Sequence, residues 1–192
     1  MAEETRQVKR YVEHQLAKMS GSSNESATRS LLANLRRGIG EKPGSVPALW
    51  GITFDGLPES LCGTDTSPSR AEWAVHTALT LYALHQQGKE MKHQPMHQKG
   101  ATLGKSLRKL INNDEEEKRV KRRFDAAATS DSLEEFSHHL RGLIQLLKSQ
   151  SVPLDYASLA ENLYWFQSPD QRDMVRLGWG RDFYRIPVKK PD

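Results

Sequence analysis

The chain has 192 residues and a formal net charge of +4, with 36% apolar and 27% charged residues. This length can bury a core without disulfides or metal ions. Cys62 is alone, no apolar run reaches the roughly 20 residues of a membrane span, and the first residues lack a hydrophobic signal core, so we expect a soluble cytoplasmic protein.

Apolar residues recur at helical spacing along most of the chain, and no segment shows the alternation of a strand. We therefore predict an all-α protein, a compact bundle of seven to nine helices. The expected helices span 3–19, 25–37, 47–52, 69–87, 102–112, 114–128, 130–147, 153–166 and 168–183.

Several local signals refine these helices. Ser69 and Glu72 form a capping-box pattern, and the pair Ser168 and Gln171 has the same spacing. The helix that follows Ser69 is apolar on more than one side, which predicts a central and largely buried position. In the short helix at 47–52 we expect Trp50 to be the apolar anchor.

Two Gly- and Pro-rich loops, at 55–68 and 88–100, divide the chain and are expected to be flexible. Either loop can be the boundary between two small helical subdomains. We assign residues 1–68 to an N-terminal helical segment with a long loop, residues 69–185 to a helical core with a basic surface, and residues 186–192 to a tail.

Catalytic and metal-binding patterns are missing. His93 and His97 have the i, i+4 spacing of a ligand pair, but Pro95 lies between them. There is no HExxH, no nucleophile elbow and no glycine-rich phosphate loop. His76 and His85 are interpreted as packing or surface groups on helix faces. We expect no enzyme, no metal site and no cofactor.

Positive charge concentrates in residues 99–123, which hold nine basic and four acidic residues. Burial of Val120, Phe124 and Ala127 would leave the cations of this helix on two exposed flanks. Such a ridge can follow a phosphate backbone without reading bases. It can equally be a solvated helix face balanced by the acidic run at 114–117, and both interpretations stay open here.

Several segments, taken together and in order, resemble the CasB family, the small subunit of the type I-E CRISPR effector complex Cascade. The segments are LLANLRRGIGEKPGSVPALWGI, AEWAVHTALTLYALHQQ, ATLGKSLRKL, RRF, HLRGLIQLLKSQSVPLDYASLAENLYWFQSP and VRLGWGRDFYR. The resemblance covers roughly residues 31–185, whereas the first 30 residues and the insertion at 55–68 match nothing in it.

This resemblance implies a non-catalytic helical subunit, present in two copies, that contacts other Cascade subunits. It also implies contacts to guide RNA, to target DNA and to the displaced strand of the R-loop. The family often has two consecutive arginines where Arg141-Gly142 stands here. The nucleic-acid-binding residues that we expect are Arg36, Arg37, Arg70, Lys105, Arg108, Lys109, Arg119, Arg122, Arg123 and Arg141, of which Lys105, Arg108, Lys109 and Arg119 come from the charge pattern alone.

Two other classes stay open. A helical scaffold would use its basic faces only to bind acidic surfaces of partner proteins. A metal-dependent nuclease is disfavoured because the sequence supplies no cluster of ligands.

Overall fold

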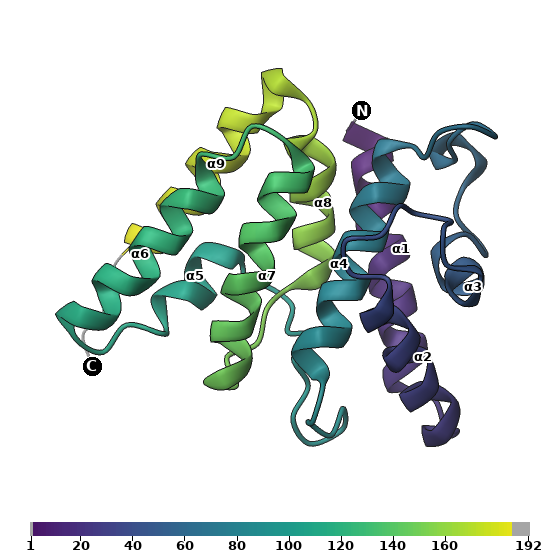
Figure 1. Ribbon diagram of the computed structural model, residues 1–192, viewed down its shortest axis with the longest axis horizontal. Coiled ribbons are helices and arrows are strands. Elements are labelled where there is room, and N and C mark those ends of the chain that lie inside the picture. The colour runs from purple at the N-terminus through teal and green to yellow at the C-terminus, as the bar shows by residue number, and fades with distance from the viewer. Residues whose placement is uncertain (1, 186–192) are drawn as a thin grey trace.

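The computed structural model describes residues 2–185, which form helices joined by loops (Figure 1). This part of the chain contains nine α-helices, two 3-10 helices (η1 and η2) and no strand, which confirms the all-α prediction. Their bounds are α1 Ala2–Ser20, α2 Glu25–Arg37, η1 Pro47–Leu49, α3 Trp50–Thr53, η2 Glu59–Leu61, α4 Arg70–Gln86, α5 Leu103–Arg108, α6 Asp114–Ala128, α7 Leu133–Ser149, α8 Tyr156–Phe166 and α9 Pro169–Tyr184. The predicted tail at 186–192 lies outside the described residues.

Helix α4 is the centre of the molecule, as its all-round apolar pattern predicts. Nearly all of its residues are buried, and it packs against α1, α2, α7 and α8. Its start is the predicted capping box, because Ser69 Oγ accepts from the Glu72 amide at 3.0 Å and Glu72 Oε2 accepts from the Ser69 amide at 2.7 Å.

The other helices lie at the two ends of this centre (Figure 1). Helices α1, α2 and α3 lie at one end and α5, α6 and α9 at the other, with α4, α7 and α8 between them. Helix α1 packs on α8, so the first helix contacts a segment late in the sequence, across the boundary that we place between residues 68 and 69. The division at this boundary stays a prediction.

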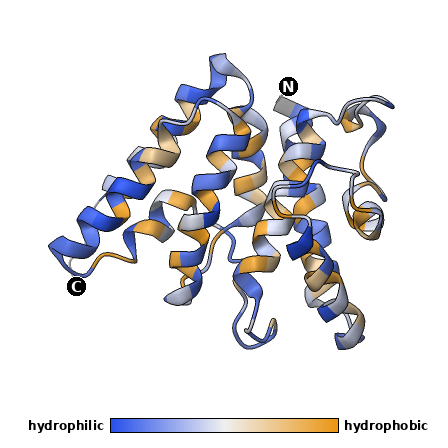
Figure 2. Cartoon of the chain, in the orientation of Figure 1, coloured by the Kyte–Doolittle hydropathy of each residue, from blue (hydrophilic) through white to orange (hydrophobic). Residues whose placement is uncertain are grey.

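A cluster of aromatic rings joins α7, α8 and α9. The Phe136 ring lies 4.7 Å from that of Phe166 and 4.9 Å from that of Trp179, between ring centroids. Phe136 and Phe166 are fully buried and Trp179 nearly so. Figure 2 shows apolar residues on all these helices, whereas the visible side of α6 is mostly hydrophilic.

One detail of the N-terminal half differs from the prediction. Trp50 is not the apolar anchor of its short helix: it is 52% exposed, and Leu49 and Ile52 are the buried residues. The Trp50 indole N–H instead donates to the Gly44 carbonyl at 2.8 Å, which holds the ring on the surface. A polar indole nitrogen that finds its partner in a surface loop favours this outward position.

The starts of α7 and α9 also differ from the prediction. Ser132, rather than residue 130 or 131, caps α7, where its side chain accepts from the Glu135 amide. No capping box forms at Ser168, because its side chain accepts no capping hydrogen bond. Pro169 occupies the first turn of α9 instead, where its missing N–H costs nothing.

The helix predicted at 102–112 ends earlier than expected. The loop before it, predicted to be flexible, is partly fixed by α4. Helix α5 ends at Arg108, followed by turns. In the loop at 88–100, Met96 is buried and its amide donates to Gln86 Oε1 at 2.8 Å, so the α4 side chain fixes this part of the loop.

Candidate nucleic-acid interface

Helix α6 presents the densest group of cations. Asn113 caps it, and four acidic residues occupy its first turn, where they complement the helix dipole. Val120, Phe124 and Ala127 face the core as predicted, and the Phe124 ring lies 5.0 Å from that of Phe183 on α9. This orientation leaves its cations exposed, among them Arg119, Arg122 and Arg123.

Helix α5 adds three exposed cations beside α6, namely Lys105, Arg108 and Lys109. Arg108 contacts Glu117 of α6 at 3.6 Å, so part of its charge is already balanced. Gly104 lets α5 approach the backbone of α9, since a Cβ at this position would overlap the Trp179 carbonyl oxygen. The close crossing of α5 and α9 therefore sets where these three cations lie.

Helix α7 contributes Arg141 from the middle of its length. Its buried side carries Phe136, Leu140, Leu143 and Ile144, while Arg141 points to solvent. Next to it, a Cβ on Gly142 would meet no atom within 4 Å.

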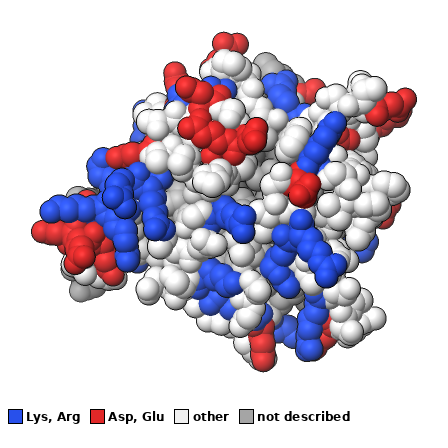
Figure 3. Space-filling model, in the orientation of Figure 1, with Lys and Arg blue, Asp and Glu red and all other residues white. Residues whose placement is uncertain are grey.

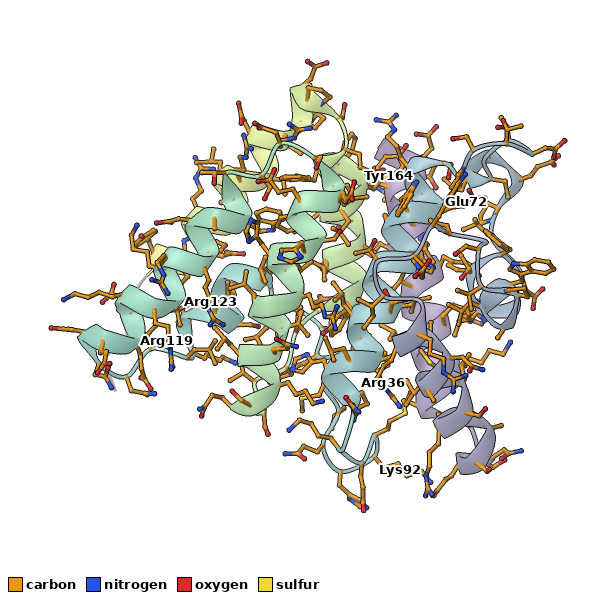
Figure 4. All side chains as sticks on the ribbon, in the orientation of Figure 1. Arg36, Glu72, Lys92, Arg119, Arg123 and Tyr164 are labelled. Carbon is orange, nitrogen blue, oxygen red and sulfur yellow. The ribbon has the colours of Figure 1, made fainter. Side chains whose placement is uncertain are left out.

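The end of α2 carries Arg36 and Arg37, the first half-buried and the second exposed. The buried His76 of α4 fixes this end, because its Nε2 lies 2.8 Å from the Gly38 carbonyl oxygen. Burial lowers the pKa of His76, so the ring is neutral near pH 7 and Nε2 donates to the carbonyl. Helix α2 thus holds Arg36 in a fixed place beside α4 (Figure 4).

Blue patches lie on one face of the molecule in Figure 3, over α6, α7, α2 and the lower end of α4, whereas red patches lie along its upper part and at the tip of α6. Arg36, Arg119 and Arg123 all lie in the same view in Figure 4, at opposite sides of this face. Nine of the ten predicted residues form no ion pair with any described carboxylate. They are Arg36, Arg37, Arg70, Lys105, Lys109, Arg119, Arg122, Arg123 and Arg141.

Arg70 lies apart from this group. It begins α4, at the end of the helix opposite to its loop at 88–100, and its guanidinium lies 5.2 Å from the centroid of the Tyr164 ring. The Tyr164 hydroxyl donates to Glu4 at 2.7 Å, and this hydrogen bond is the main cause that lowers the pKa of Glu4, with a smaller contribution from the positive charge of Arg70. A contact of this kind ties α4 to α8 and α1, so the structure gives Arg70 a partner within the chain.

Two lysines that the sequence argument left out lie at the ends of α7 and α4. Lys148 is in the last turn of α7 and Lys89 follows the end of α4, and both are half-buried. Lys148 Nζ donates to Gln87 at 2.9 Å, and Lys89 Nζ donates to Ser151 at 2.6 Å. The sequence did indicate that each lysine lies at the end of a predicted helix. Nothing in the sequence, however, indicates that these two helix ends lie side by side.

Metal and nucleophile chemistry finds little support in the described residues. Nowhere between residues 2 and 185 do three His, Cys, Asp or Glu side chains gather in a way that could hold a metal ion. His97 accepts from the Tyr156 amide at 3.2 Å through Nδ1, away from His93, which lies near Glu90. Partial burial and nearby carboxylates raise the pKa of Cys62, which keeps the thiol protonated and weakly nucleophilic.

Within residues 2–185, every helix is too short or too polar to cross a bilayer.

Comparisons with known proteins agree with the fold. Residues 31–184 match the model of the family described as CRISPR-associated protein Cse2. Among curated proteins no match is found. The crystal structure of CasB from Thermobifida fusca is 31% identical, with a TM-score of 0.78 over 93% of this chain and 98% of that one.

Two more distant structures share the fold. CasB from Thermus thermophilus is 24% identical, with a TM-score of 0.67 over 92% of this chain and 97% of that one. CasB from M. ruber is 20% identical, with a TM-score of 0.63 over 91% of this chain and 93% of that one. The match of the family model over most of the chain and the likeness to the Thermobifida fusca protein together show that this chain belongs to the CasB (Cse2) family of the type I-E CRISPR complex Cascade.

Proposed function

We propose that this chain is the non-catalytic small subunit of Cascade and binds nucleic-acid phosphates without reading their sequence. In antiviral defence it would hold guide RNA and target DNA and stabilise the displaced strand of the R-loop. The observation that carries this proposal is the face of unpaired cations over α6, α7 and the end of α2 (Figure 3).

The mechanism follows from electrostatics. Lysine and arginine side chains that contact phosphates release condensed counterions, and this gain does not depend on base sequence. Pairing between guide and target supplies the specificity. Because the exchange of a DNA duplex for an RNA–DNA heteroduplex is nearly balanced, even moderate binding of the displaced strand favours the open R-loop.

The scaffold alternative has its own support, on α9. Met174, Leu177 and Tyr184 are each more than half exposed and recur at helical spacing, which gives α9 an uncovered apolar stripe. A stripe of this kind fits a contact with another subunit or with the second copy of this chain. Protein contacts through α9 and phosphate contacts through the basic face are compatible, because the two features use different side chains.

Charge reversal tests the proposal. We expect Arg36→Glu, Arg123→Glu and Arg141→Glu each to weaken target-DNA binding by the assembled complex about tenfold or more, since each removes one phosphate contact and adds a repulsion. Circular dichroism should stay unchanged, because all three side chains reach solvent. Arg10→Glu is the control, since Arg10 already lies 3.8 Å from Glu3 on α1.

Unchanged affinity in all three variants would refute the assignment of this face and favour the scaffold. A cleavage assay with Mg²⁺ or Mn²⁺ tests the nuclease alternative, and the proposal predicts no cleavage by the chain.

A further inference from the structure

Two histidine rings, those of His138 and His139, lie side by side on α7. His138 is exposed and His139 is half-buried. Their ring centroids are 5.6 Å apart and their planes meet at 78°, so the two rings contact each other edge to face. Within residues 2–185, neither imidazole forms a hydrogen bond or an ion pair. The contacts inside the described chain therefore orient the rings but leave their polar atoms unused.

His138 lies on the outermost line of α7. The buried side of this helix consists of Phe136, Leu140, Leu143, Ile144 and Leu147. At about 100° per residue, His138 points directly away from that side. Gly142 lies one turn later, and it carries no side chain that could cover the His138 ring. A Cβ there would meet no atom within 4 Å. The His138 ring is therefore accessible to a ligand from solvent.

The charges next to His138 change sign along the helix. Glu134 lies one turn before it and Arg141 one turn after it, and both side chains are exposed. Figure 3 shows the same change on this face, with red patches in its upper part and blue patches over α7 below them. A phosphate near His138 is therefore repelled by Glu134 and attracted by Arg141.

Neither helix stability nor packing explains a histidine at position 138. Histidine is a weaker helix former than the alanine, glutamate, glutamine and lysine residues that suit exposed helical positions. The ring is exposed, and the core lies on the other side of α7. An aromatic ring beside a cation is, however, the combination with which proteins bind single strands, because bases stack on the ring and phosphates contact the cation. Imidazole is one of the rings that stack on unpaired bases.

We propose that His138, oriented by His139, is a stacking platform for one unpaired base of the displaced strand, and that Arg141 contacts the phosphate next to this base. The displaced strand is the occupant because the bases of guide and target strand pair with each other, whereas its own bases are unpaired. The contact does not read the sequence, since every base has a flat face. This inference rests on the proposed function and adds to it a contact that requires a base.

The first test measures binding of two target DNAs by the assembled complex. One DNA has a normal displaced strand, and the other has a displaced strand without bases along the stretch opposite the guide. His138→Ala should weaken binding of the normal DNA about fivefold, as expected for the loss of one small stacked ring, and should not change binding of the abasic DNA. His138→Phe should retain most of the affinity, because phenylalanine also stacks. His14→Ala is the matched control, since His14 is exposed on another helix, α1.

The second test is a salt series, which separates stacking from charge. His138→Ala should leave the slope of log affinity against log salt unchanged, because stacking releases no counterions. Arg141→Gln should lower this slope by up to about 0.7 with both DNAs. The melting temperature of the free protein should not fall in His138→Ala, because alanine favours the helix more than histidine does.

The outcomes separate the stacking platform from the proposed function. If His138→Ala weakens binding of both DNAs equally, or His138→Phe loses as much affinity as His138→Ala, the ring does not stack and the platform is wrong. If His138→Ala changes neither affinity while Arg123→Glu weakens both, the platform is wrong and the function stands. If neither variant weakens binding, both fail. If His138→Ala prevents assembly of the complex, the ring contacts another subunit and the platform is again wrong.

Discussion

Two histidines of the central helix are buried, and burial keeps both of them neutral. His85 Nδ1 lies 2.8 Å from the Tyr156 hydroxyl, its Nε2 has no hydrogen-bond partner among residues 2–185, and burial is the main cause that lowers its pKa to about 4. His76 holds the end of α2 in the same neutral form. Of the two interpretations made from the sequence, packing or surface groups, these observations support packing for both residues.

Burial of His85 predicts how stability depends on pH. The unfolded chain binds a proton at His85 near pH 6.5, whereas the folded protein does so only near pH 4. Stability therefore falls as the pH drops from 7 toward 4, and His85 accounts for about 2 kcal/mol between pH 7 and pH 5.

His85→Asn removes the titration and keeps a polar atom near the position of Nδ1. We expect its loss of unfolding free energy between pH 7 and pH 5 to be about 2 kcal/mol smaller than that of the unmodified protein, measured by urea titration. An equal loss in both proteins would mean that His85 is protonated in the folded state. His14→Asn is the control, since His14 is exposed.

At the scale of elements, two glycines in helices have opposite roles. Gly104 sits where α5 crosses α9, and a Cβ there would overlap the Trp179 carbonyl oxygen and lie 2.7 Å from the Phe183 amide nitrogen. Gly142 on α7 has open space around the same position. Backbone atoms cannot rotate away as a side chain can, so only the first glycine is required by packing.

Alanine at each glycine tests this difference. Gly104→Ala should destabilise the protein by about 1–3 kcal/mol, because α5 must move away from α9. Gly142→Ala should stabilise it by about 0.5–1 kcal/mol, because alanine favours the helix. Thermal or urea unfolding of both variants measures these changes, and similar effects at the two positions would contradict the close crossing.

At the scale of the whole molecule, the position of Gly142 allows the basic face to be strengthened. The space around it accepts a longer side chain, and Arg141 next to it is already exposed. Gly142→Arg would supply the second of the two consecutive arginines that are frequent in the family. It adds one cation between the α6 group and the end of α7.

We expect Gly142→Arg to tighten target-DNA binding by the complex several-fold at low salt and less at high salt. Gly142→Ala separates the helix effect from the charge, because it should leave affinity unchanged. An equal gain for the two variants would show that helix stability, not charge, sets the affinity. No gain for Gly142→Arg would place the nucleic acid away from this part of α7.

Local patterns in the sequence determined where several helices begin and which of their sides are buried. The spacing of Val120, Phe124 and Ala127 indicated which side of α6 is buried, and Ser69 with Glu72 marked the start of α4. Such features depend on residues within one or two helical turns of each other. The order of several segments also carried the family resemblance, which the comparisons confirm.

Only the tertiary structure decided what depends on contacts between distant segments. It placed Trp50 on the surface, gave Arg70 a partner in Tyr164, and joined the ends of α4 and α7 through the hydrogen bonds of Lys89 to Ser151 and of Lys148 to Gln87. Lys89 and Lys148 are separated by 59 positions in the chain, and no periodicity relates them. The sequence shows which segments are rich in cations. The packing of α2, α4 and α7 determines which of these cations come close enough for their charges to interact.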